Sequence, residues 1–143
     1  MVDPDRRKAE VTIMWKMWLK DVLVGLGIIV AVFILELVVM IPFGGSTGTD
    51  RSAAMRLEFA LAALPALVVS VVVSGLSGTQ SPSSAWRRSL LWTIMLFAVY
   101  ALIGAGNGDI GEILSVWTLY LLLAGVFLGP WIRLAIQKRK QRN

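Results

Sequence analysis

VLVGLGIIVAVFILELVVMIPF, residues 22–43, holds a single charged side chain, that of Glu36. As a helix with a rise of ~1.5 Å per residue, a run of this length crosses a hydrocarbon core of ~30 Å. Three further apolar runs follow, at about 55–75, 86–106 and 110–132. In lipid every backbone polar group must be paired within its own segment, so such runs are helices. The sequence therefore predicts an all-α integral membrane protein built on a four-transmembrane-helix bundle.

The composition supports a membrane environment for the whole chain. Hydrophobic residues make up 57% of the 143 residues, and a soluble domain of this size could not bury that much apolar surface. The runs are joined by short polar segments at 44–49, 77–84 and 104–111, which are rich in Gly, Ser and Thr or contain Asn and Asp. Short connections favour antiparallel neighbours, so we expect residues 1–143 to form one membrane domain.

The distribution of Lys and Arg predicts the orientation. Of the 14 basic residues, only Arg51 and Arg56 lie beside the first connection. The others precede the first span, lie at Arg87 and Arg88 after the second connection, or belong to the basic tail at 133–143. By the positive-inside rule, the N-terminus, the second connection and the C-terminus are cytoplasmic.

The segment before the first span predicts an amphipathic interfacial helix at 5–20. Val11, Met14, Trp15, Trp18 and Val22 recur mostly at steps of three and four, and a second face carries Lys. Trp and Lys suit the headgroup region, since each has an apolar body and a polar tip. We expect an anchor on anionic headgroups that involves four residues: Trp15, Lys16, Trp18 and Lys20.

Glu36 is the most unusual residue of the spans. A charged side chain near the bilayer centre costs at least ~2.5 kcal/mol on insertion scales, so it usually faces the bundle interior or takes a partner. One interpretation is a proton or cation site. The other is an interhelical hydrogen bond or a contact with a partner protein. Glu58 and Arg56 lie near the same outer side, and with Glu36 they form a candidate ion, proton or partner site.

Small residues form two stripes typical of close helix packing. One follows the second span at steps of four, and the other is a G-x-x-x-G motif in the fourth; the members are Ala62, Ala66, Ser70, Ser74, Gly125 and Gly129. Such stripes let helix backbones approach closely where no hydrophobic force acts between helices. They either pack the bundle internally or form an interface with another chain.

The missing residue types exclude several chemistries. The chain has no Cys and no His, which removes disulfides, thiolate metal sites and the commonest general base. No phosphate-binding loop or hydrolase motif is present, so we expect no enzyme activity, no cofactor and no metal. The net charge of +5 arises at span ends, which indicates membrane topology and not nucleic-acid binding.

Two functions remain open. The first is a non-catalytic accessory or assembly subunit of a larger membrane complex, which would contact other membrane subunits or itself. The second is a small homo-oligomeric transporter or channel that uses Glu36 as a proton- or cation-binding residue. The compact loops favour a bacterial inner membrane as the location.

Overall fold

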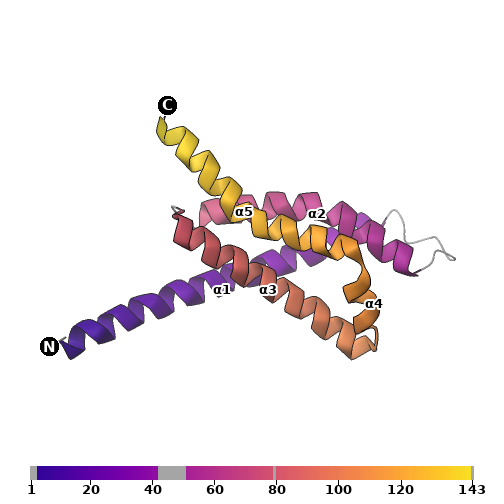
Figure 1. The fold of residues 1–143 in the computed structure, drawn as a ribbon, viewed down its shortest axis with the longest axis horizontal. Coiled ribbons are helices and arrows are strands. Elements are labelled where there is room, and N and C mark those ends of the chain that lie inside the picture. Colours follow the sequence, from indigo (N-terminus) through magenta and orange to yellow (C-terminus); the bar gives the residue numbers. More distant parts are fainter. Residues whose placement is uncertain (1–2, 42–50, 79, 143) are drawn as a thin grey trace.

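The computed structural model describes residues 3–41, 51–78 and 80–142, and this part of the chain is 94% helical with no strand. Its helices are α1 (Pro4–Met40), α2 (Arg51–Leu76), α3 (Pro82–Asn107), α4 (Ile110–Ser115) and α5 (Trp117–Arg142) (Figure 1). The four long helices are each long and apolar enough to cross a membrane. The prediction of an all-helical chain with four such helices is confirmed.

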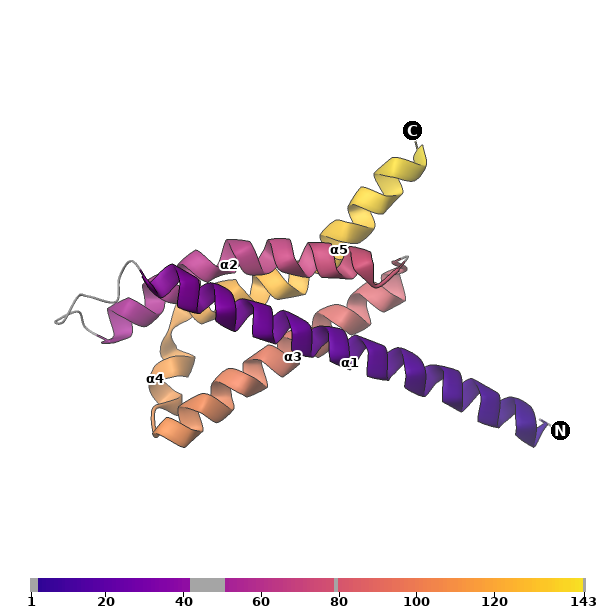
Figure 2. The same cartoon turned by 180° about the vertical axis from the view of Figure 1, so that it is seen from behind.

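Helix α1 differs from the prediction of an interfacial helix followed by a separate span. It is one continuous helix of 37 residues, which at ~1.5 Å per residue is about 55 Å long. Its N-terminal end extends straight past the other helices (Figures 1 and 2). We call residues 4–20 of this helix the arm of α1. No Gly or Pro interrupts the chain between residues 5 and 24, so nothing in the sequence breaks the helix where the apolar run begins. Residues 42–43, the predicted end of the first span, lie outside the described residues.

The four long helices are arranged as a square. Helix α1 packs on α2 and α3, α5 packs on the same two helices, and the α2–α5 contact is the most extensive. Helices α1 and α3 run from one end of the bundle to the other in the same direction, and α2 and α5 run back (Figures 1 and 2). The short connection between α2 and α3 therefore joins helices that are not close neighbours, contrary to our expectation for short loops. The reason is the close fit of α5 against α2.

That fit comes from the two stripes of small residues. Ala62, Ala66, Ser70 and Ser74 are fully buried, and Gly125 and Gly129 face them from α5. A β-carbon at Gly125 would lie 2.7 Å from the Ala63 carbonyl oxygen, and one at Gly129 would overlap the side chain of Ser70. The Ser70 hydroxyl donates to the Val126 carbonyl oxygen at 2.8 Å. The structure thus packs the stripes against each other inside one chain.

The predicted fourth span at 110–132 is divided in the structure. Residues 110–115 form the short α4, Val116 takes an extended backbone conformation, and a new helix starts at Trp117. Helix α3 ends at Asn107 and is capped by Gly108, whose φ of 76° is left-handed. The chain then folds back so that Ile110 lies over Gly104. The predicted tail at 133–143 is not separate either, because α5 continues to Arg142.

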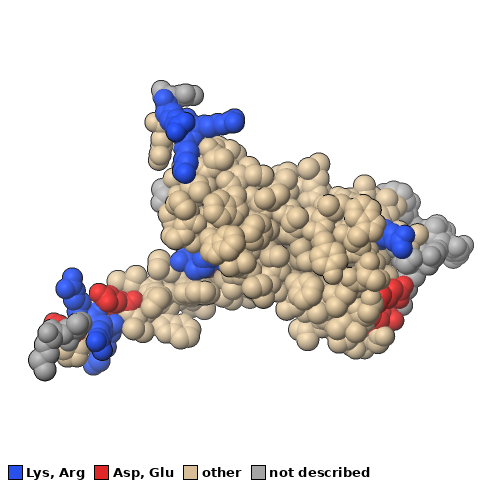
Figure 3. All heavy atoms as spheres, in the orientation of Figure 1, with Lys and Arg blue, Asp and Glu red and all other residues tan. Residues whose placement is uncertain are grey.

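The two ends of the bundle differ in charge. Basic side chains gather on the arm of α1, together with a few acidic ones, and on the C-terminal end of α5 (Figure 3). Acidic side chains gather at the opposite end, next to a basic one, and the band between carries many exposed apolar side chains such as Leu64, Val68 and Ile94. Helix α5 changes direction on the way to its basic end (Figure 1), and it contains Pro130, a residue that kinks helices. We call the end that holds residues 77–81 the basic end and the end that holds α4 the acidic end.

Candidate functional site

Glu36, the residue singled out in the first span, has a partner at the acidic end. The helix places it on the face of α1 that turns toward α3, where it is 3% exposed. The Tyr100 hydroxyl of α3 donates a hydrogen bond to Glu36 Oε1. The rings of Phe33 and Phe59 pack against Tyr100 with centroids 5.5 and 5.2 Å away. Because the carboxyl group is buried beside these rings, the hydroxyl is the polar contact that compensates for its burial.

A hollow of about 200 Å³ adjoins this pair, and its wall contains a second carboxylate. Glu58 of α2 lines it together with Glu36, Tyr100 and both phenylalanines. Arg56 is exposed and does not line the hollow. The structure therefore brings together two of the three residues of the predicted site, and the charges available to a ligand are negative. Two carboxylates and aromatic faces in one apolar hollow suit a proton or a small cation.

A second polar cluster, at the basic end, was not predicted. Asp21 on α1 is 1% exposed and accepts from two arginines of α3. Arg87 donates to Asp21 Oδ2 from Nε at 2.9 Å and Nη2 at 2.7 Å, and Arg88 donates from Nε to Oδ1 at 2.9 Å. The buried carboxylate is thus engaged on both of its oxygens. Charge-assisted contacts of this kind are among the strongest hydrogen bonds in proteins.

The surroundings of Asp21 hold α1 and α3 in register. The Trp92 indole nitrogen donates to the Asp21 carbonyl oxygen at 2.9 Å. The same indole covers Gly25, where a β-carbon would lie 2.7 Å from Trp92 Cδ1. Ser77, which follows α2, joins the cluster through its backbone. Its carbonyl oxygen accepts from Lys20 Nζ and from Arg88 Nη2, each at 3.3 Å. The C-terminal end of α2, the N-terminal end of α3 and the middle of α1 therefore meet at this point.

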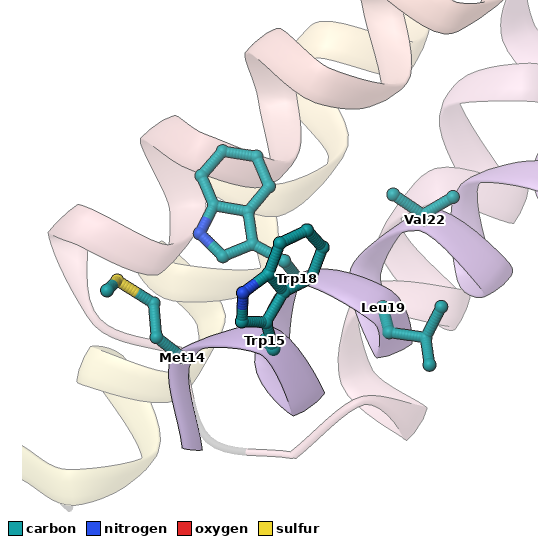
Figure 4. Close-up of a pocket in the computed structure, with 5 residues that line it drawn as sticks. All are labelled: Met14, Trp15, Trp18, Leu19 and Val22. Carbon is teal, nitrogen blue, oxygen red and sulfur yellow. The ribbon is translucent and has the colours of Figure 1, made fainter. Parts of the chain in front are cut away.

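The predicted membrane-surface anchor falls on the arm of α1, and its four residues are exposed. Trp15 and Trp18 line an apolar hollow of about 410 Å³ with neighbours from the same helix, Met14, Leu19 and Val22 (Figure 4). Figure 4 shows these side chains standing out from successive turns of α1. Trp18 also lies under the Arg87 guanidinium, 5.9 Å from its ring centroid, which is within cation–π range.

The sequence patterns did not point to Asp21, Trp92 or Tyr100, but Asp21 and Tyr100 can be located by comparing the depths of residues along α1 and α3. Asp21 directly precedes the first apolar run, and Arg87 and Arg88 begin the third. Helices of the same direction that start at one membrane face bring residues of equal depth together. Glu36 and Tyr100 lie about 15 and about 12 residues further on, which is a similar depth of roughly 20 Å.

Among the described residues, no group of three or more acids forms a metal-binding cluster. Comparisons of the chain with protein-family models, with curated proteins and with solved structures give no match.

Proposed function

We propose that the chain is a multi-pass membrane protein with its basic end in the cytoplasm, and that it acts as a non-catalytic accessory or assembly subunit of a larger membrane complex. Its four long helices and the apolar band between the charged ends support the membrane location. The concentration of Lys and Arg at the basic end supports the orientation.

The arm of α1 is the observation that carries the subunit role. With Ile41 at the outer edge of a ~30 Å core, about 20 residues of α1 occupy the core, and about five more occupy the headgroup layer. That places Trp18 in the inner headgroup layer and Trp15 just beyond it. Residues further toward the N-terminus extend beyond them, where Val11, Ile13 and Met14 are 48%, 59% and 51% exposed.

A straight helix cannot both span the bilayer and lie flat on its surface. Val11, Ile13 and Met14 are therefore covered neither by this chain nor by lipid when α1 stands upright. A helix of another subunit would remove this apolar surface from water, which stabilises by ~25 cal/mol per Å². The buried acids of α1 also fit a structural role, since Asp21 and Glu36 both bind α3.

Purification of the full chain in a mild detergent tests the subunit role. We expect a complex with a second protein in fixed stoichiometry, seen by native mass. A photo-crosslinker at Met14 should capture that protein, and one at Leu102, exposed on α3 near the other end, should not. Deleting residues 3–14 should release it. A chain that purifies alone, with or without the arm, would overturn this role.

A homo-oligomeric transporter is the second candidate, and the hollow with Glu36 and Glu58 favours it. Its test is ion or proton flux in liposomes that contain the purified chain. A transporter that uses Glu36 would lose flux in Glu36→Gln, because the amide keeps the shape of the carboxyl but neither exchanges a proton nor carries charge. Arg56→Gln is the matched control, since Arg56 does not line the hollow. Flux by the wild type that Glu36→Gln abolishes would favour this candidate over the subunit.

A further inference from the structure

A hollow of about 360 Å³ opens beside the Asp21 cluster at the basic end. Its wall contains three cations, Lys20, Arg87 and Arg88, and one carboxylate, that of Asp21. The wall therefore carries a net charge of +2. Arg88 is buried, whereas Arg87 is partly exposed and Lys20 is exposed. The positive potential of this wall is therefore open to the solvent, where it attracts an anion.

Two buried nitrogen atoms of the wall have unused hydrogen-bonding capacity. Arg88, 6% exposed, binds Asp21 and Ser77 through Nε and Nη2, and its Nη1 has no partner among the described residues. Gln80, 5% exposed, accepts from Ser84 through Oε1, and its Nε2 likewise has no partner in the described part of the chain. Both atoms are donors, so the missing partner is an acceptor. Each atom has less than 1 Å² exposed, so its side chain must turn toward the hollow to meet an acceptor there.

The start of α3 adds to the positive potential. The hollow reaches Ser81 and Ser84, which form the capping box at the start of this helix of 26 residues. The partial positive charge of a helix N-terminus favours an anion there. Guanidinium, ammonium and amide donors around one space match the several acceptor oxygens of a phosphate group.

We propose that this hollow is a binding site for a phosphate group, held by Lys20, Arg88 and Gln80. Arg88 offers Nη1 while its Nε stays on Asp21, so the phosphate adds a contact without breaking the tie between α1 and α3. The phosphate comes from an anionic lipid headgroup or from a soluble phosphate compound. Only the lipid source rests on the proposed membrane location, and the proposal is independent of the subunit role.

Lys20→Gln tests the site with little risk to the fold, because Lys20 is exposed and does not bind Asp21. Lys16→Gln is the matched control one turn away on the same helix: it removes the same charge from the arm but does not line the hollow. Gln80→Glu is a second variant, which places a negative charge where the phosphate would lie. Circular dichroism and melting temperature establish that each variant is folded.

The first measurement is retention of phosphatidylglycerol relative to phosphatidylcholine by the purified full chain, counted by native mass spectrometry. Lys20→Gln and Gln80→Glu should lower the relative affinity at least about tenfold, the effect of losing one hydrogen bond to a charged group. Lys16→Gln should leave it within about twofold of wild type. The second measurement is binding of glycerol 3-phosphate to the same samples in neutral detergent.

The outcomes separate the sources. Loss of lipid retention confined to Lys20→Gln and Gln80→Glu, without binding of glycerol 3-phosphate, identifies a lipid headgroup. Binding of glycerol 3-phosphate that the same two variants weaken identifies a soluble phosphate compound. Equal effects of Lys16→Gln and Lys20→Gln would show general attraction to an anionic surface, and no effect of either would show an unoccupied hollow. Either of these last results overturns the site, whether or not the chain purifies in a complex.

Discussion

Replacing Gly129 with alanine should separate α5 from α2. The added β-carbon would lie 2.8 Å from the backbone carbonyl carbon of Ser70 and would overlap the Ser70 side chain. Ordinary contacts between carbon atoms are ~3.5–4.0 Å, so the two helices must move apart by about 1 Å at this point. The neighbouring atom is backbone, which no change of rotamer removes.

The magnitude follows from three effects. Overpacking by one methyl group in a well-packed interior costs about 1–3 kcal/mol. A gap of ~0.5–1 Å along the seam also forfeits a quarter to a half of the dispersion attraction there. The hydrogen bond from the Ser70 hydroxyl to the Val126 carbonyl, now 2.8 Å long, would stretch beyond bonding distance and lose ~0.6–1.7 kcal/mol. We expect the free energy of unfolding to fall by about 2–4 kcal/mol.

The measurement is unfolding of the purified chain in mixed micelles by increasing SDS, followed by tryptophan fluorescence and circular dichroism. Gly27→Ala and Gly106→Ala are matched controls, because a β-carbon at either position meets no atom within 4 Å. These controls should be neutral or more stable by up to ~1 kcal/mol, as alanine favours a helix over glycine. A Gly129→Ala variant within about 0.5 kcal/mol of the controls would refute the close contact between α2 and α5.

Three further predictions concern the two polar clusters and the orientation. A cysteine at Gly108 should react with an impermeant reagent added to intact cells, whereas a cysteine at Ser83 should react only after permeabilisation. The chain has no other cysteine, and labelling at Ser83 from outside would contradict the proposed orientation. Asp21→Asn should lower the free energy of unfolding by about 3–5 kcal/mol because it leaves buried arginine charge uncompensated. The control Glu10→Gln on the exposed arm should change it by less than ~0.5 kcal/mol, and equal effects of the two variants would contradict the buried ion pair. Tyr100→Phe should cost ~0.6–1.7 kcal/mol in the same assay, and a variant as stable as wild type would contradict the hydrogen bond to the carboxyl group of α1.

The existence of the four long helices could be predicted because length and hydropathy are local properties of the chain. The boundaries could not, since a helix does not end where the lipid ends. The basic arm continues α1 because residues such as Lys16 are good helix formers in water. The fourth apolar run is interrupted at Val116 because the chain folds back at Gly108 and packs on Gly104. This interruption depends on tertiary packing and not on a local sequence signal.

The packing partners were also beyond the sequence pattern. Small residues such as Ser70 and Gly129 predicted that backbones approach closely, but a stripe does not identify the helix that it meets. The position of Glu36 in an apolar run predicted that it has a partner but did not identify the partner. Tyr100 stands out in its own apolar run only when its depth is compared with that of Glu36. Asp21 was overlooked because it lies one residue before the run that defined the span.

The bundle uses two different means of holding its helices together. On the α2–α5 side, glycine and serine bring the backbones into contact, so packing itself stabilises the pair. On the α1–α3 side, Trp92 fills the space over Gly25 and the contact is less extensive, so polar contacts join the helices, one near each end. Sliding α1 by a single residue, ~1.5 Å along its axis, would disturb both contacts at once, which fixes the register of the pair. The strength of a polar contact depends on the charges near it, whereas close packing of glycine and serine does not. Both hollows with charged walls adjoin the α1–α3 side.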